Sequence, residues 1–282
     1  MATYHSAQQV HDEEGFQYHV GVKPGDVARR IMLVGDPARA DKVASRFDSI
    51  RVRRENREYV TITGPYCGHE LTVTATGIGT DNTEIAVIEL TQCVEDPTFL
   101  RVGSCGALQD GISLGDLIVS TGALRLEATS THYVPEGYPA VAHHEVVLAL
   151  MEAARDVRDR AVHTGVTATA CGFYGAQGRT IPGFPPRDPD LTQKLSGYGV
   201  KNLEMEASLL FTLATLRGLR AGAVCAVYAS RKADTFVDTS IKDAAESAAI
   251  EMGLAALEVL RRMDSARGDA PCWTPSAGLA KK

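Results

Sequence analysis

The sequence predicts one α/β domain, in which helices cover both faces of a mostly parallel β-sheet. Short apolar runs typical of buried strands alternate along the chain with segments of helical spacing, and several of the runs stop at glycine. No internal repeat or linker divides the 282 residues, a length that suits a single large domain. Ligands of such sheets bind outside the carboxyl ends of the strands, so the glycine-rich strand ends are the first candidates for a site.

The first half of the chain begins with a strand and a capped helix. Residues 31–34 form an apolar run that Gly35 ends, and Pro37 behind Asp36 suits the first turn of a helix that continues to residue 47. The other elements expected here are a hairpin of residues 59–63 and 71–76, a helix over 82–94, and strands over 99–102 and 117–120.

The second half contains a long irregular segment between a strand and a helix. Residues 172–192 are rich in Gly, Pro and Arg, and a loop of that length is usually functional. Around it we expect a helix over 146–157, a strand over 162–170, a helix over 205–216, a strand over 221–229 and a helix over 239–263. We expect residues 1–17 to form a flexible arm, 18–263 the domain, and 264–282 a disordered tail.

Charge and composition argue against several classes of partner. The net charge of −6 and the absence of a basic stripe argue against a nucleic acid polymer. No apolar run reaches the roughly 18 residues that span a bilayer, and the N-terminal residues are polar, so we expect a cytoplasmic protein without membrane contact. The six cysteines are scattered without CxxC spacing, which gives no indication of a zinc site or a redox pair.

Two strand ends combine glycine with arginine, as a phosphate site requires. One is Gly35-Asp36-Pro37-Ala38-Arg39, and the other runs from Arg101 to Gly106 and includes Ser104. A phosphate binds to bare backbone N–H groups, a hydroxyl donor and guanidinium groups, and these segments supply all three. Taken alone, each segment is a weak signal, and a structural turn or an arginine paired to a carboxylate explains it as well.

Three further patterns carry chemistry and leave alternatives open. Glu204 and Glu206 precede an apolar helix, so one can face a pocket, or both can simply be acids at a helix N-terminus. Gln177 and Arg179 offer the donors and acceptor that match a uracil edge, although a solvated loop explains them too. Gly77-Ile78-Gly79 lacks the third glycine of a dinucleotide site, because Asn82 stands there, so an NAD-dependent dehydrogenase is disfavoured.

Together and in this order, such segments resemble the nucleoside phosphorylase family, in particular its uridine phosphorylase branch. The resemblance runs from about residue 18 to about residue 260 and rests on His19-Val20-Gly21, the Gly35 to Arg39 turn, Arg57-Glu58-Tyr59, Thr76 to Gly79, Phe99 to Gly103, Phe173-Tyr174, Gln177 to Arg179 and Asn202 to Glu206. It implies a mixed central sheet, partly barrel-like and flanked by helices. It also implies reversible phosphorolysis of uridine to uracil and ribose 1-phosphate in pyrimidine salvage, with phosphate as co-substrate and no cofactor, in a homodimer or a hexamer of dimers.

The resemblance also implies a role for each matched residue. Phosphate would be bound by Gly35, Arg39, Arg101, Ser104 and, from the neighbouring subunit, Arg57. The ribose would be held by Met205, Glu206 and the neighbour's His19, and the base by Phe173, Gln177, Arg179 and Tyr228. Arg101, Glu206 and Arg179 would be catalytic. No metal is needed for the chemistry, but Glu58, Ile78 and Asn82 match positions that can bind a cation at the dimer interface, with Asn82 where relatives often carry Ser.

The choice of branch rests on the base-binding positions. The family's purine enzymes and nucleosidases usually place an Asp where this chain has Ser230, followed by Arg231, and uridine phosphorylases carry the Gln-x-Arg pair. Tyr228 stands at a position that is often aliphatic, which leaves uridine, thymidine and 5-substituted pyrimidines open. The alternatives are a purine nucleoside phosphorylase or nucleosidase on the same fold, and a non-catalytic storage or binding relative.

Overall fold

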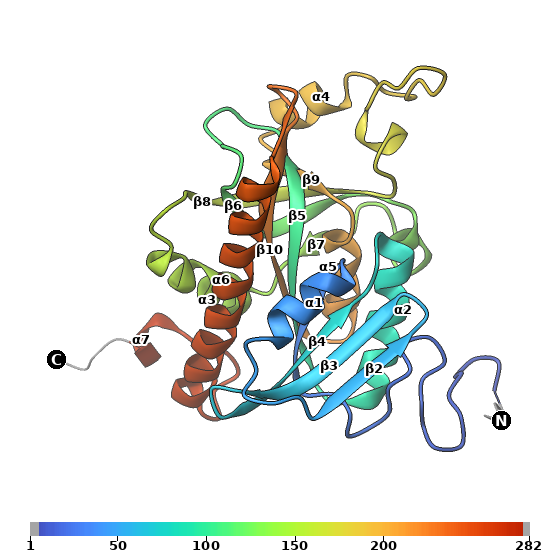
Figure 1. The fold of residues 1–282 in the computed structure, drawn as a ribbon, viewed down its shortest axis with the longest axis vertical. Helices are drawn as coiled ribbons and strands as arrows, with labels where there is room; N and C mark the ends of the chain where they lie inside the picture. Colours follow the sequence, from blue (N-terminus) through green and yellow to red (C-terminus); the bar gives the residue numbers. More distant parts are fainter. Residues whose placement is uncertain (1–5, 279–282) are drawn as a thin grey trace.

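Eleven strands form one mixed β-sheet at the centre of the molecule, in a computed structural model that describes residues 6–278 (Figure 1). The strands are β1 (Arg30–Val34), β2 (Val52–Asn56), β3 (Tyr59–Tyr66), β4 (His69–Ala75), β5 (Thr98–Ala107), β6 (Leu117–Leu126), β7 (Ala140–Val141), β8 (Val162–Ala170), β9 (Asn202–Glu204), β10 (Arg220–Ser230) and β11 (Thr235–Phe236).

Part of this sheet closes into a ring. The strands follow the order β11-β10-β6-β8-β9-β5-β1-β4-β3-β2, and β5 pairs with β10 as well as with β9. Strands β5, β9, β8, β6 and β10 therefore close on one another, while β1, β4, β3 and β2 extend outward from β5 as an open sheet. The expectation of a mixed, partly barrel-like sheet is confirmed.

Helices cover the sheet on two faces, as predicted. The helices are α1 (Pro37–Ala44), α2 (Thr80–Cys93), α3 (His144–Ala153), α4 (Leu191–Gly197), α5 (Ala207–Leu216), α6 (Thr239–Arg267) and α7 (Pro275–Gly278), with short 3-10 turns at Thr129–His132, Ala154–Asp156 and Gly175–Gln177. Buried side chains of α1, α3 and α6 form one apolar cluster against the strands, and those of α2 and α5 form a second. The sheet is thus the middle of three layers.

The sequence predicted most of these elements, and two of its errors concern pairing with distant segments. Asp36 caps α1 as expected, its side chain accepting the N–H of Ala38 at 2.9 Å. Strand β5 was expected to stop at Val102, but it continues through Gly103 to Ala107 because β10 pairs with it along this whole length. Strand β9 was missed, since it is only three residues long and pairs with the distant strands β5 and β8. Strand β2 was missed although it forms a local hairpin with β3, because its mainly charged residues lack an apolar pattern.

The C-terminal segment packs against the domain beyond the predicted end of the last helix. Helix α6 continues to Arg267, and the N–H of Trp273 donates to Glu145 at 2.7 Å. Near the other end, His11 and Gln17 form an isolated bridge, and Gln17 is buried. Residues 1–5 of the predicted arm and 279–282 of the predicted tail lie outside the described residues. Within the described part of the chain, no helix is both long and apolar enough to cross a bilayer.

Two carboxylates in the C-terminal contact area should make the protein sensitive to acid. Burial raises the pKa of Glu145, but hydrogen bonds from Trp273 and Arg220 outweigh it and hold that pKa below its ordinary value. The pKa of Asp264 is also held below its ordinary value, because hydrogen bonds and charge from Arg220 outweigh the effect of burial. A lowered folded pKa gives stability that is present above the unfolded pKa and is lost as the pH falls through the folded one. We therefore expect the free energy of unfolding to drop below about pH 4.

Urea denaturation between pH 7 and pH 3 measures this dependence. The doubly substituted variant Glu145→Gln, Asp264→Asn should show a shallower loss of stability with acid than the unaltered protein. The control is Glu152→Gln, which removes a solvent-exposed partner of Arg155 and should leave the slope unchanged. Equal slopes for the double variant and the unaltered protein would contradict the assignment.

Candidate functional site

The carboxyl ends of β1 and β4 meet beside the middle of the parallel strand β5. Strand β1 lies between β4 and β5, with Val34 opposite Ala75 and Leu33 opposite Arg101. Beyond the strand ends, Gly35 and Gly77 touch, since a Cβ added to Gly35 would lie 3.3 Å from the Gly77 carbonyl oxygen. This is the edge at which the sequence placed the site, and glycine lets two backbones come close there.

Arg39 extends from α1 to this edge and is 6% exposed. Its Nε donates to Glu246 Oε1 at 2.6 Å, and its Nη1 donates to the Val102 carbonyl oxygen at 3.2 Å. Glu246 lies on α6 and also pairs with Lys42, and these two bases outweigh the effect of burial and hold its pKa below the ordinary value. Because Val102 follows Arg101, the guanidinium of Arg39 lies against the strand that carries the second arginine.

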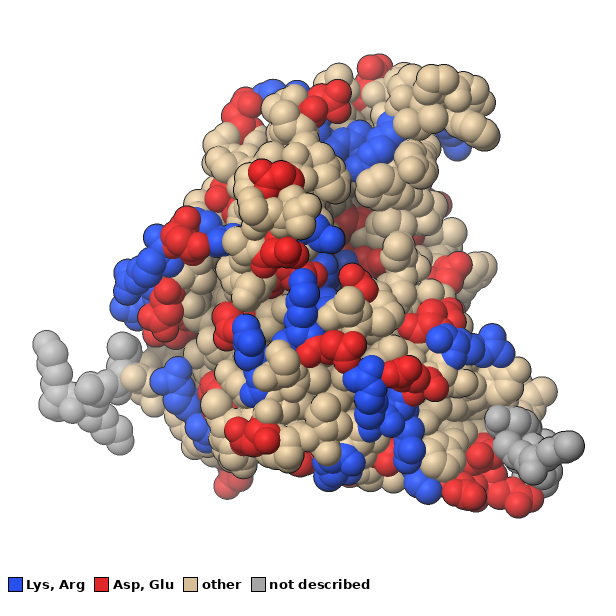
Figure 2. Space-filling model, viewed as in Figure 1, with Lys and Arg blue, Asp and Glu red and all other residues tan. Residues whose placement is uncertain are grey.

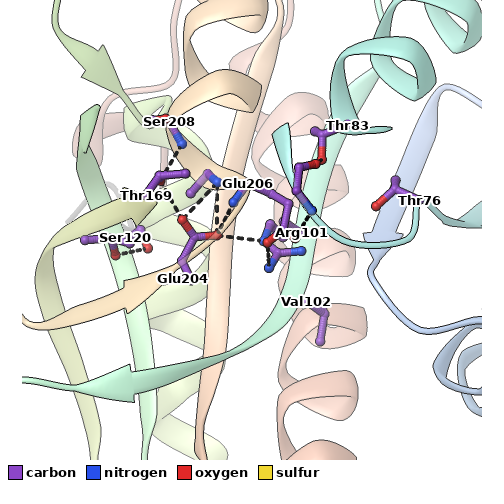
Figure 3. A network of polar contacts seen from close by, with 12 residues as sticks. Thr76, Thr83, Arg101, Val102, Ser120, Thr169, Glu204, Glu206 and Ser208 are labelled. Carbon is purple, nitrogen blue, oxygen red and sulfur yellow. Dashed lines mark hydrogen bonds and ion pairs between the residues drawn. The ribbon is translucent and has the colours of Figure 1, made fainter. Parts of the chain in front are cut away.

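Arg101 lies on β5 between two carboxylates and is 5% exposed (Figure 3). Its Nε donates to Glu204 Oε2 at 3.1 Å, and its Nη2 donates to Glu206 Oε2. Burial alone lowers the pKa of Arg101, but Glu206 and Glu204 outweigh it and hold that pKa above its ordinary value. A Cβ at Gly103 would lie 2.7 Å from Nη2 of Arg101, so a side chain there would displace the guanidinium from its place between the two carboxylates.

The two carboxylates at the start of α5 have different partners. Glu204 accepts the hydroxyl of Thr169 at 2.5 Å and the backbone N–H groups of Glu206 and Ala207, so it fixes the N-terminus of the helix. Glu206 instead accepts the N–H of Gly79 at 2.7 Å together with Arg101. Burial, opposed by Arg101 and assisted by Glu204, raises the pKa of Glu206. Glu204 is therefore structural, while Glu206 joins the arginine to the Gly77–Gly79 turn.

The loop of residues 171–190 holds a second cluster, in which an arginine stacks on an aromatic ring. The guanidinium carbon of Arg179 lies 3.7 Å from the ring centre of Phe173, and its Nη1 donates to Gln177 Oε1 at 2.7 Å. Burial, followed by the charge of Arg231, lowers the pKa of Arg179 to about 10. Figure 2 shows the surface hollowed beneath the projecting part of the molecule to which this loop belongs.

Arg231 is a candidate that the sequence interpretation did not include in the site. It follows the end of β10, and its backbone N–H donates to the Ala107 carbonyl oxygen at 2.9 Å. Its Nη1 is buried and has no hydrogen-bond partner among the described residues. Burial lowers the pKa of Arg231. A recess of about 410 Å³ adjoins it, lined by Leu108, Thr192, Gln193, Ser196, Gly197, Arg231 and Lys232. The only sequence signal was its place after a strand end.

Other predicted site residues lie apart from the arginine pair. Arg57 donates to the Tyr18 hydroxyl at 3.0 Å, and His19 Nδ1 lies 2.6 Å from Glu89 Oε1. Over the part of the chain that the structure describes, no hydrogen bond or ion pair joins either of them to Arg101. Ser104 is half-buried within β5, opposite Ala226 of β10.

Tyr228 and the proposed cation positions also have defined surroundings. The Tyr228 hydroxyl lies 3.4 Å from Nη2 of Arg39, and among the described residues no hydrogen bond joins its side chain to the 171–190 loop. Glu58 and Asn82 lie beside the turn that carries Ile78, since a Cβ at Gly77 would lie 3.5 Å from Glu58 Cγ and 2.7 Å from Asn82 Nδ2. No group of three or more His, Cys, Asp or Glu side chains within residues 6–278 is arranged to hold a metal.

The fold and this edge define an α/β protein with a buried arginine pair at the carboxyl ends of its strands. The family model of the phosphorylase superfamily matches residues 29–261, so the chain belongs to that superfamily.

Curated phosphorylases match most of the chain. It is 50% identical over 244 residues to the uridine phosphorylase of Thermococcus kodakarensis, covering 85% of this chain and 87% of the relative. It is 38% identical to the uridine phosphorylase of Treponema pallidum, over 89% of this chain and 96% of the relative. It is also 38% identical to the guanosine phosphorylase of Halorubrum lacusprofundi, over 75% and 82% of the two chains.

The different partners of the two glutamates predict different losses of stability. Glu204→Gln should lower the free energy of unfolding by about 3 kcal/mol, because it removes a buried charge that accepts from Arg101, from the Thr169 hydroxyl and from two N–H groups of the helix N-terminus. Glu206→Gln should lower it less, because Glu204 remains to neutralise Arg101 and the amide oxygen can still accept the Gly79 N–H. Urea denaturation of both variants at pH 7 provides the comparison. A loss for Glu206→Gln as large as that for Glu204→Gln would contradict the division of roles.

Proposed function

We propose that the protein is a uridine phosphorylase, which uses inorganic phosphate to split uridine reversibly into uracil and ribose 1-phosphate. The observation that carries the proposal is the buried arginine pair, in which Arg39 binds the carbonyl of the residue that follows Arg101. Two guanidinium groups drawn from distant parts of the chain suit a small, doubly charged anion. The names of the relatives in Thermococcus and Treponema support uridine as the substrate.

Phosphate would lie where β1 ends beside the middle of β5. Arg39 and Arg101 would bind its oxygens, the backbone at Gly35 would approach it closely, and the Ser104 hydroxyl would donate to it. Both guanidinium groups are already held by carboxylates, so little reorganisation is needed when the anion arrives. Arg57 of a neighbouring subunit would complete the site.

The nucleoside would lie between this edge and the 171–190 loop. Glu206 and Met205 would hold the ribose, with His19 of the neighbouring subunit at its 5′ hydroxyl. Phe173 and Tyr228 would contact the base.

Cleavage would proceed by attack of phosphate on C1′. Phosphate oxygen forms the new bond to C1′ as the C1′–N bond breaks, and the electron pair leaves on the base. Gln177 and Arg179 would stabilise the negative charge on the uracil oxygens. The site would hold phosphate and the nucleoside in line, so proximity and electrostatic stabilisation would both lower the barrier to the reaction. No cofactor is required for this reaction.

The proposed roles of Arg57 and His19 require at least a homodimer. Within their own chain both residues have other partners. Arg57 donates to the Tyr18 hydroxyl, and His19 lies against Glu89, so neither is bound to the arginine pair. A dimer or a hexamer built from dimers meets the requirement. Glu58, Asn82 and the Ile78 carbonyl could bind a structural cation at that interface. The cytoplasmic location stays a prediction from the sequence.

A purine nucleoside is the second candidate, and the guanosine phosphorylase of Halorubrum is the observation that favours it. Uridine is preferred because the end of β10 carries Ser230, whose hydroxyl accepts the N–H of Ala233 at 3.2 Å, where a purine enzyme needs an acid. Incubation with uridine or guanosine, each with and without phosphate, separates the candidates by ultraviolet absorbance. Uridine cleavage that depends on phosphate supports the proposal, and guanosine cleavage alone contradicts it.

Substitutions at the two ends of the site should affect different substrates. Arg101→Ala should raise the KM for phosphate and lower kcat by about 100-fold or more, because a preorganised charge is lost. Gln177→Ala should chiefly raise the KM for uridine, because the base loses a donor and an acceptor. Steady-state kinetics with phosphate and uridine varied separately measure both effects. Equal effects of the two substitutions on both substrates would contradict the assignment.

A further inference from the structure

Three groups hold the guanidinium of Arg39, and one of them is a tyrosine of β10. Glu246 accepts from Nε at 2.6 Å, the Val102 carbonyl accepts from Nη1 at 3.2 Å, and the Tyr228 hydroxyl accepts from Nη2 at 3.4 Å. A guanidinium carries five N–H groups. Within the described chain, these contacts leave one N–H on each terminal nitrogen available for an anion.

The three contacts do different work. The Nε–H lies in the guanidinium plane, so the short contact with Glu246 restricts rotation of that plane as well as the position of the group. The contacts at Nη1 and Nη2 lie farther from the bond about which the plane turns, so they restrict its direction further. One of them is a backbone carbonyl of β5 that does not depend on the side chain at position 102, so Tyr228 is the side chain that holds the outer end of the plane.

Packing fixes the Tyr228 hydroxyl in this place. The residue is 9% exposed, and its ring belongs to the apolar cluster that includes side chains of α1 and α6. Arg39 extends from α1 and Glu246 from α6, so the two charged groups and the hydroxyl lie beside the same cluster. Burial raises the pKa of Tyr228, which keeps the hydroxyl protonated near neutral pH.

We propose that Tyr228 is a positioning residue for phosphate, acting through the plane of the Arg39 guanidinium. The sequence placed Tyr228 beside the base, whereas its described polar contact is with Arg39. The inference rests on the proposed function, in which Arg39 binds phosphate. It assigns to Tyr228 an effect on phosphate affinity that an aliphatic residue at the same position cannot supply.

Tyr228→Phe tests the inference, because it removes the hydroxyl and keeps the ring that packs in the core. The KM for phosphate should rise about threefold to tenfold, the factor expected for one hydrogen bond, while the KM for uridine stays within about twofold. The dissociation constant for inorganic phosphate, measured by calorimetry without nucleoside, should rise by a similar factor. Glu246→Gln loosens the same guanidinium at Nε and should also raise the phosphate constants.

The matched control is Tyr66→Phe, which removes a hydroxyl from another tyrosine that packs against the same cluster. Among the described residues no hydrogen bond joins Tyr66 to Arg39, so the phosphate constants of this variant should stay unchanged. Thermal denaturation of each variant confirms that the fold is retained.

The outcomes separate this inference from the proposed function. If the unaltered protein cleaves uridine with phosphate and Tyr228→Phe leaves both phosphate constants unchanged, the inference is wrong and the function stands. If Tyr228→Phe raises the KM for uridine as much as that for phosphate, Tyr228 acts at the base instead. If the unaltered protein neither binds inorganic phosphate nor consumes it, the proposed function itself is wrong.

Discussion

The site depends on the compensation of buried arginines by buried carboxylates. Arg101 lies between Glu204 and Glu206, and Arg39 lies against Glu246. An uncompensated charge at such depth is very unfavourable, because the protein interior solvates it poorly. The carboxylates therefore make it feasible to bury guanidinium groups at the strand ends, and they hold those groups in fixed orientations. Several N–H groups on each arginine are left without a carboxylate partner, and these are the ones an anion can use.

Compensation also limits what the two arginines can attract. Glu246 is shared by Arg39 and Lys42, and two glutamates flank Arg101, so these three bases are matched by three acids. The chain as a whole has a net charge of −6, so its overall field does not draw an anion inward. Binding of phosphate would then depend on the direction of N–H groups and on a further positive charge. Arg57, whose described hydrogen bond is to a tyrosine hydroxyl rather than to an acid, would supply that charge from a second subunit.

The sequence predicted several features that depend on local chemistry and missed the extent of strands that pair with distant segments. Asp36 before Pro37 predicts the capped helix correctly, because a cap involves only neighbouring residues. The stretch from Gly103 to Gly106 was taken as a strand end, since no local pattern reveals that β10 pairs with it. The pair Glu204 and Glu206 allowed two interpretations. Side chains two residues apart at a strand-to-helix junction can point in different directions, but the sequence does not show which groups each of them contacts.

The two ends of the proposed site differ in how their positive charge is balanced. At the phosphate end each buried arginine faces a carboxylate, and the pKa of Arg101 is raised. At the base end, the acceptors described for Arg179 are the neutral oxygens of Phe173 and Gln177, and the charge of Arg231 adds to burial in lowering its pKa to about 10. Arg179 is still charged near neutral pH, but its charge is not offset by an acid. In the proposed reaction the base departs as an anion at this end, so unbalanced positive charge is present where negative charge develops.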